Sequence, residues 1–278
     1  MLGDIRVFVA GVAQLDSGTV WMALFFIALE SVAPRAGVKV STASRMRAVA
    51  FWSVYNVAIL LLFNLMGPAW TRLGVRPFLP TLAPPGMPHL LSVLIGCLAA
   101  AYVGDFVYYW CHRFQHRYLW RFHAVHHSVR EMSGITAYHH ISEQIFNFLL
   151  YTVPLSLVTR DPLVIPMLGW LLALQGNYLH SPTWINFGPL GRYWIDNRYH
   201  RIHHSIEQRH FDKNFGLFTT LWDSIFGTAC FPARDEWPET GVVDFREPAT
   251  VRDFLLSPLT YRRAPAQQTD DTLAPERA

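Results

Sequence analysis

The sequence has 278 residues, of which 51% are hydrophobic and only 15% are charged. A net charge of +3 is too small to indicate a nucleic-acid partner, and the low charge content argues against a disordered chain. The three cysteines are too few and too scattered for a disulfide framework or a CxxC metal site. Thirteen histidines among 10 Trp, 11 Tyr and 19 Phe instead indicate a membrane protein that carries a metal.

Three long apolar runs lie in the first 111 residues, at 20–32, 49–70 and 89–111. The longer runs approach the roughly 20 residues with which a helix crosses a bilayer. One such run could be a buried helix of a globular protein, but three in succession favour membrane spans. Residues 1–111 are therefore predicted to form N-terminal transmembrane helices, with Glu30 in the first run and Asp105 near the end of the third.

A fourth apolar region covers residues 145–179 and is interrupted by charge and proline at 159–162. Such an interruption predicts a turn, so we expect a membrane hairpin of two helices. This hairpin lies within a histidine-rich catalytic region predicted over 112–261. Residues 262–278 have the composition of a disordered tail.

Basic residues orient the predicted spans. They follow the first and third runs in two groups: Arg35, Lys39, Arg45 and Arg47, then Arg113, Arg117, Arg121 and Arg130. The positive-inside rule places both groups on the cytoplasmic side of the membrane. The expected fold is an all-α integral membrane helical bundle with a cytoplasmic, histidine-rich di-metal cap.

Eleven of the 13 histidines fall between positions 112 and 204. They form the motifs HRFQH, HAVHH, a His–His pair and HRIHH, together with one single histidine: His112, His116, His123, His126, His127, His139, His140, His180, His200, His203 and His204. Separations of three and four residues place side chains on one helix face. A continuous helix from 112 to 127 would hold five of them within an arc of roughly 100°, and separate helices would serve equally well.

Metal binding is the best explanation of such a set, although a single HxxxH motif would be weak evidence. Imidazoles packed this closely repel one another when protonated, whereas a metal binds the neutral ring. One zinc uses three or four protein ligands and would leave most of these histidines without a metal. Two ions with four or five ligands each would use nearly all of them. An all-nitrogen site suits iron, copper or zinc.

The order of HRFQH, HAVHH, the His pair and HRIHHS, followed by DKNFG and WDSIFGT, resembles the fatty acid hydroxylase/sterol desaturase superfamily over residues 105–228. The resemblance implies a membrane-bound non-haem di-iron oxidoreductase that uses O2 as co-substrate to hydroxylate or desaturate a lipid C–H bond. It assigns nine of these histidines to two iron ions and adds a tenth ligand, either His139 or His140, from the stretch 136–143. The lipid would be fatty acyl, sterol or related.

Four polar residues are candidates to orient the ligands, since a ligating imidazole usually donates its other N–H to an oxygen. Asp105 lies two turns before His112 on the same face, and the others match family motif positions: Asp212, Asn214 and Asp223. No haem- or flavin-binding segment is visible, so electrons are expected from a separate cytochrome-type or ferredoxin/reductase donor. Two alternatives remain: a zinc-dependent membrane hydrolase with Glu143 as the nearest candidate base, or a non-enzymatic metal- or haem-binding membrane protein.

Overall fold

The computed structural model describes residues 2–74, 76–78, 86–158 and 164–261. Throughout these residues the secondary structure is helical, with isolated β-bridges and no strand. The predicted all-α fold is therefore confirmed. The predicted tail at 262–278 and the predicted turn at 159–162 lie outside the described residues.

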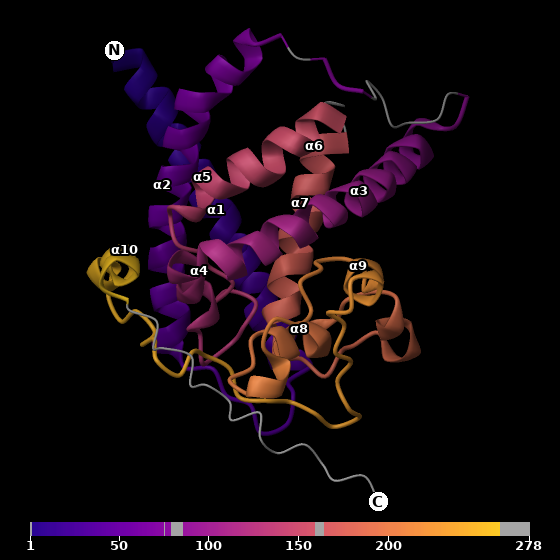
Figure 1. Cartoon of the computed structure of the whole chain (residues 1–278). Helices are drawn as coiled ribbons and strands as arrows, with labels where there is room; N and C mark the ends of the chain where they lie inside the picture. The colour runs from indigo at the N-terminus through magenta and orange to yellow at the C-terminus, as the bar shows by residue number, and fades with distance from the viewer. Residues whose placement is uncertain (1, 75, 79–85, 159–163, 262–278) are drawn as a thin grey trace, which may run out of the picture.

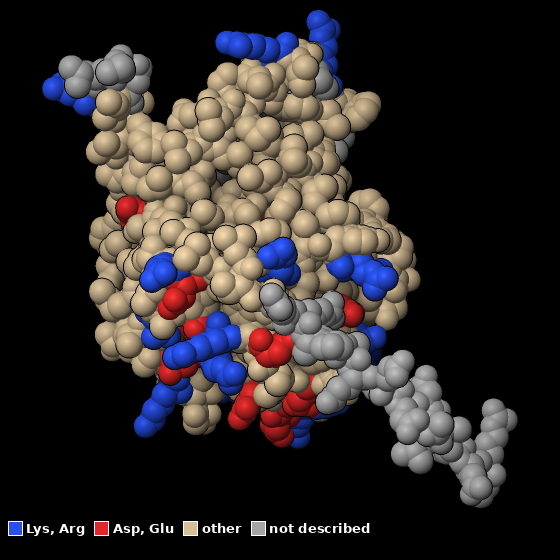
Figure 2. Space-filling view, turned by 60° about the vertical axis from the view of Figure 1, so that its left-hand side comes forward, with Lys and Arg blue, Asp and Glu red and all other residues tan. Residues whose placement is uncertain are grey.

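Three long helices are apolar enough to cross a membrane: α1 (Leu2–Val32), α2 (Thr42–Arg72) and α3 (His89–Tyr118). The first is longer than the apolar run at 20–32 predicted, because residues 5–19 continue the helix and its apolar character. Figure 2 shows a broad zone of the surface almost free of charge, with most charged residues gathered at one end of the molecule. The helices and this zone indicate an integral membrane protein.

Buried polar contacts join α1 to its neighbours. Arg45 on α2 donates to Glu30 Oε2 at 2.7 Å, while Glu30 Oε1 accepts from the Gly134 backbone N–H at 2.7 Å and from Ser181 Oγ at 3.1 Å. A carboxylate at this depth requires such partners, because an unpaired buried charge is costly. Glu30 thereby ties the end of α1 to α2, to the loop around 134 and to the end of α7 (Val164–His180).

The fourth apolar region forms two helical arms that pack against α3. The first arm consists of α5 (Glu143–Asn147), the π-helical turn η1 (Phe148–Thr152) and α6 (Val153–Val158), and the second arm is α7. Their shared core consists of small and aliphatic side chains: Val93, Cys97, Ala100, Ala101, Leu155 and Leu168. Helix α7 ends at His180, which it delivers to the end of the bundle where the later helices lie (Figure 1).

The remaining helices form a cap at that end of the bundle (Figure 1). They are short: α4 (Trp120–His127), η2 (Gly188–Arg192), α8 (Asn197–His203), η3 (Gln208–His210), α9 (Leu221–Ile225) and α10 (Val251–Thr260). Phe254 of α10 stacks on Phe51 of α2 with ring centroids 4.6 Å apart, and Tyr138 meets Phe51 edge-on at 5.0 Å. This aromatic core fixes the cap against the membrane helices.

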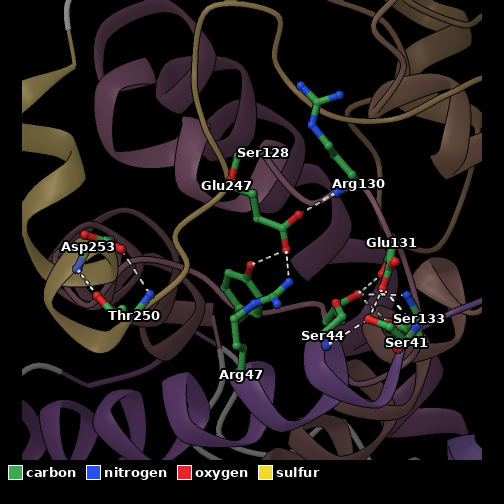
Figure 3. Close-up of polar contacts among 12 residues, drawn as sticks. Ser41, Ser44, Arg47, Ser128, Arg130, Glu131, Ser133, Glu247, Thr250 and Asp253 are labelled. Carbon is green, nitrogen blue, oxygen red and sulfur yellow. Dashed lines mark hydrogen bonds and ion pairs between the residues drawn. The ribbon is translucent and has the colours of Figure 1, made fainter.

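Carboxylates hold the loop that follows α4 against the start of α2 (Figure 3). Glu131 accepts from the Ser41 N–H at 2.9 Å and from Ser41 Oγ at 2.7 Å, and Ser41 in turn caps α2. Glu247 accepts from the Arg130 N–H at 3.2 Å and from Arg47 at 3.4 Å. The segment between α4 and α5, which carries His139 and His140, is therefore anchored at its beginning.

Candidate metal centre

The first two histidine motifs lie on two helices. Helix α3 ends at Tyr118 and α4 begins at Trp120, because Leu119 leaves the helical region with φ −120° and ψ 17°. The turn folds the second motif back onto the first. Nε2 of His123 lies 3.0 Å from Nε2 of His112, and Nε2 of His127 lies 3.1 Å from Nε2 of His116.

Helix α8 adds a histidine from 91 residues further along the chain. Asp196 caps this helix by accepting from the N–H groups of Arg198 and Tyr199. Nε2 of His203 then lies 3.1 Å from Nε2 of His112. Potential ligand atoms of five histidines lie within 4.8 Å of one another and form the first group: His112, His116, His123, His127 and His203.

A second group of four histidines lies beside the first: His126, His180, His200 and His204. Nε2 atoms of His200 and His204 are 3.1 Å apart, and His180 approaches both from the end of α7 with ring centroids 4.7–4.8 Å away. The groups are adjacent, since the rings of His127 and His204 stack at 4.3 Å. Nine imidazoles from α3, α4, α7 and α8 therefore form two neighbouring candidate metal sites.

The consecutive residues His139 and His140 lie differently. The His139 ring stacks on His126 at 3.8 Å, and its Nδ1 is 3.1 Å from Glu143 Oε2. His140 instead directs Nδ1 to Ser142 Oγ and Nε2 to the carbonyl of Leu255. Neither residue belongs to the two groups, but His139 has a potential ligand atom within 4.8 Å of those of His123 and Glu143. Among the residues that the structure describes, His140 has no such set of neighbours, so His139 is the better candidate ligand.

Backbone carbonyls orient several of the rings. Nδ1–H of His112 donates to the Phe215 carbonyl at 2.9 Å, and Nδ1–H of His203 donates to the Lys213 carbonyl at 2.7 Å. In the second group, His126 donates to Tyr138 and His180 to Gly176 in the same way. These bonds fix the tautomer that leaves each Nε2 lone pair free for a metal.

The predicted orienting residues Asp105, Asn214 and Asp223 act on the loop that supplies those carbonyls. Asp105 accepts from the backbone N–H groups of residues 217–219 at 2.8–3.0 Å, and Asp223 accepts from those of residues 215 and 216. Asn214 bonds to the backbone of Tyr199 and Cys230. Asp105 and His112 lie on the same helix but are two turns apart, which is a distance of about 10 Å along the helix axis.

Asp212 is the predicted orienting residue that lies beside a ring. Its Oδ1 is 3.5 Å from Nδ1 of His116. The left-handed backbone at Asp212, with φ of 55°, places this side chain in the turn before Phe215. Asp212 could orient His116 directly, whereas Asp105, Asn214 and Asp223 fix the loop.

The sequence did not predict that Glu143 orients histidine rings. Glu143 was considered only as the candidate base of a zinc hydrolase. The fully buried Oε2 lies 2.9 Å from Nδ1 of His123 and accepts from Gln115 Nε2 at 3.1 Å. Burial alone would raise the pKa of Glu143, but the charges and hydrogen bonds of His123 and His139 outweigh burial and hold the pKa well below its usual range. The signal in the sequence was the spacing of four residues between His139 and Glu143.

The donor set fits a first-row transition metal. Burial, followed by the neighbouring imidazoles, lowers the pKa well below its ordinary value for five histidines: His126, His127, His200, His203 and His204. These rings are therefore neutral, which is the form that binds a metal. Nε2 of His180 and Nδ1 of both His200 and His204 are buried with no hydrogen-bond partner among the described residues. Such orphaned nitrogens suit iron, copper or zinc and disfavour magnesium or calcium.

The lowered histidine pKa values predict that the metal-free protein loses stability as the pH falls. Below about pH 6.5 the unfolded chain binds protons that the folded histidines reject, so acidification favours unfolding. We expect the melting temperature of metal-free protein to fall steadily from pH 7.5 to pH 5, as measured by differential scanning fluorimetry in detergent. A melting temperature that stays constant over this range would contradict the neutral state of the rings.

The region that contains the site matches a known family. Residues 97–228 match the model of the fatty acid hydroxylase family. This region belongs to that family. The match includes every histidine of both groups, and it confirms the superfamily that the motif order indicated.

Several curated proteins are similar to this chain. Ornithine lipid hydroxylase OlsE of Rhizobium tropici is 32% identical over 57% of this chain and 48% of its own length. Alkylglycerol monooxygenase of Homo sapiens is 33% identical over 49% of this chain and 31% of its own length. A fatty acid hydroxylase of Lecanicillium sp is 32% identical over 45% of this chain and 39% of its own length. The chain thus spans half or less of these relatives, and no solved structure matches it.

Proposed function

We propose that this chain is a membrane-bound non-haem di-iron oxidoreductase that uses O2 to hydroxylate or desaturate a C–H bond of a fatty acyl, sterol or related lipid. The observation that carries the proposal is the convergence of nine buried imidazoles in two adjacent groups. They lie where a membrane-crossing helix meets the cap, within the family-matched region. The similar proteins named above include hydroxylases and monooxygenases whose names refer to lipids.

Each group would hold one iron, and His139 is a further candidate ligand beside both. When bound, the iron pair supplies the redox chemistry that activates O2 toward an unreactive C–H bond. The chain's own residues hold the neutral tautomers: carbonyls of Phe215 and Lys213 fix His112 and His203 in the first group. Glu143 holds His123 and His139 through their Nδ1 atoms.

Burial gives the site a second property that this chemistry requires. The rings of His123, His200 and His204 are each at most 3% exposed, and the apolar residues Val125 and Ile202 lie fully buried on the same short helices. A site closed in this way excludes bulk water, which limits side reactions of activated oxygen.

Both reactions consume O2 together with two electrons and two protons from outside the lipid. We propose that a separate cytochrome-type or ferredoxin/reductase donor delivers these electrons. We also propose that the cap faces the cytoplasm, which the basic residues after α1 and α3 support. The charged end of the molecule in Figure 2 is then the face available to a soluble donor.

The full-length protein, purified in detergent after expression with iron, is expected to contain about two irons per chain by elemental analysis. Lipids from cells with and without the gene would be compared by mass spectrometry, and we expect a gain of one oxygen or a loss of two hydrogens. Both iron content and lipid change should disappear in a variant that lacks several grouped histidines. Full activity of an iron-free, zinc-loaded preparation, or a Soret band in the active protein, would overturn the proposal.

A further inference from the structure

A cleft of about 820 Å³ opens on the surface of α3 beside the first histidine group. Its walls come from the second half of α3, from the loop that contains Asp212 and Phe215, and from Leu150 of η1. The cleft therefore lies between the exposed face of α3 and the candidate metal centre.

One wall of the cleft is an aromatic stripe. Phe106, Trp110, Phe114 and Tyr118 follow one another at intervals of four residues along α3 and are 39–69% exposed. Over these residues a helix rises about 18 Å. Large apolar side chains that remain exposed on a membrane-crossing helix face lipid, so this wall suits an acyl chain.

The lining of the cleft also includes a residue of the candidate metal centre. His116 of the first group lines the cleft, and the Phe215 ring packs against it with centroids 4.9 Å apart. An acyl chain lying along the aromatic stripe would therefore pass directly beside a histidine of the site.

Two guanidinium groups lie on the same helix as the stripe. Arg113 and Arg117 are one turn apart and both line the cleft, with Arg113 over the Trp110 ring at 5.4 Å and bonded to Tyr109 Oη at 3.0 Å. Arg117 is exposed and forms no hydrogen bond or ion pair with the residues that the structure describes. The acid that lines the cleft, Asp212, faces His116. The planar guanidinium group binds phosphate or carboxylate through two parallel hydrogen bonds.

We infer that the cleft binds one membrane lipid with an anionic headgroup, its chain along the aromatic stripe and its headgroup at Arg113 and Arg117. The inference rests on the proposed function and deepens it by naming the charge class of the substrate. The arginines determine this choice of ligand. An apolar cleft alone would accept any lipid, whereas two arginines in its lining favour an anionic headgroup over a zwitterionic one.

The test uses the full-length, metal-free protein in nanodiscs of phosphatidylcholine. Diazirine-bearing phosphatidylglycerol or phosphatidylcholine is added at a trace level, cross-linked by light and mapped by peptide mass spectrometry. We expect labelling of residues 106–118 to be at least fivefold stronger with phosphatidylglycerol. Arg117→Gln and the double variant Arg113→Gln/Arg117→Gln should reduce that labelling to the phosphatidylcholine level. Arg192→Gln, which removes the same charge from exposed η2 outside the cleft, should leave it unchanged.

Equal labelling by the two headgroups, or labelling that survives the double variant, would overturn the inference. The double variant also loses the bond from Arg113 to Tyr109 and could therefore destabilise the fold. The single Arg117 variant keeps this bond, and melting temperatures of both variants would reveal a folding defect. Cross-linking needs neither metal nor O2, so its outcome is separate from that of the proposed function. If the protein oxidised lipids but showed no headgroup selectivity in labelling, only this inference would be contradicted. If labelling were selective but no lipid were oxidised, only the proposed reaction would be contradicted.

Discussion

Replacing His203 or His200 by alanine is expected to leave each purified chain with about one metal ion and to reduce lipid oxidation by at least a hundredfold. His203 belongs to the first group, where its Nε2 lies 3.1 Å from that of His112. His200 belongs to the second group, where its Nε2 lies 3.1 Å from that of His204. Changes outside the ligand shell already cost 10- to 100-fold in affinity or activity, so the loss of a ligand should cost at least as much.

Elemental analysis and lipid mass spectrometry of the two variants measure this result. The matched control is His140→Gln. This variant also loses a histidine, but His140 contacts Ser142 and Leu255 and belongs to neither group. It should retain both ions. If His203→Ala or His200→Ala also retained two ions at full occupancy, the division of the nine histidines into two metal sites would be wrong.

Replacing Glu143 is expected to weaken metal binding without removing any grouped histidine. Its Oε2 accepts from Gln115 and lies 2.9 Å and 3.1 Å from Nδ1 of His123 and His139. Glu143→Gln removes the charge and should lower metal affinity by about 10- to 100-fold. Glu143→Ala should lower affinity further and also destabilise the fold, because each buried donor left without an acceptor costs about 1–3 kcal/mol.

Metal affinity would be measured by competition with a chelator, and folding by thermal melting in the same detergent. Glu131→Gln is the control, since this carboxylate lies on the same segment but bonds to Ser41 at the start of α2 (Figure 3). A normal melting temperature with reduced affinity in Glu143→Gln would distinguish positioning of the ligands from a general structural role. Unchanged affinity in both Glu143 variants would refute the role assigned to this carboxylate.

Local features of the sequence predicted the helices and the candidate ligands. Long runs of apolar residues form helices in a membrane because the backbone must satisfy its own hydrogen bonds there, which explains α2 and α3. Spacings of three and four residues place His200 and His203 on one short helix and His204 at its C-cap, as the structure shows. The sequence also narrowed the ligand in 136–143 to His139 or His140, but it gave no reason to choose between them.

Other features depend on contacts that no local pattern records. His126 lies between His123 and His127 in the sequence but groups with His180, His200 and His204 instead. This grouping results from the positions of α7 and α8, which place His180, His200 and His204 beside His126. Asp105 was predicted only as a candidate to orient the ligands, and the sequence did not show that it holds a loop more than 110 residues away whose carbonyls orient the rings.

Residue type and helical spacing are local properties, and they were enough to predict apolar helices with many histidine nitrogens near their ends. The folded chain was needed to show which imidazoles lie together, which carboxylate contacts them and which cleft opens beside them. Those outcomes depend on how α3, α4, α7 and α8 pack together, and packing is set by the shape and burial of residues far apart in the chain.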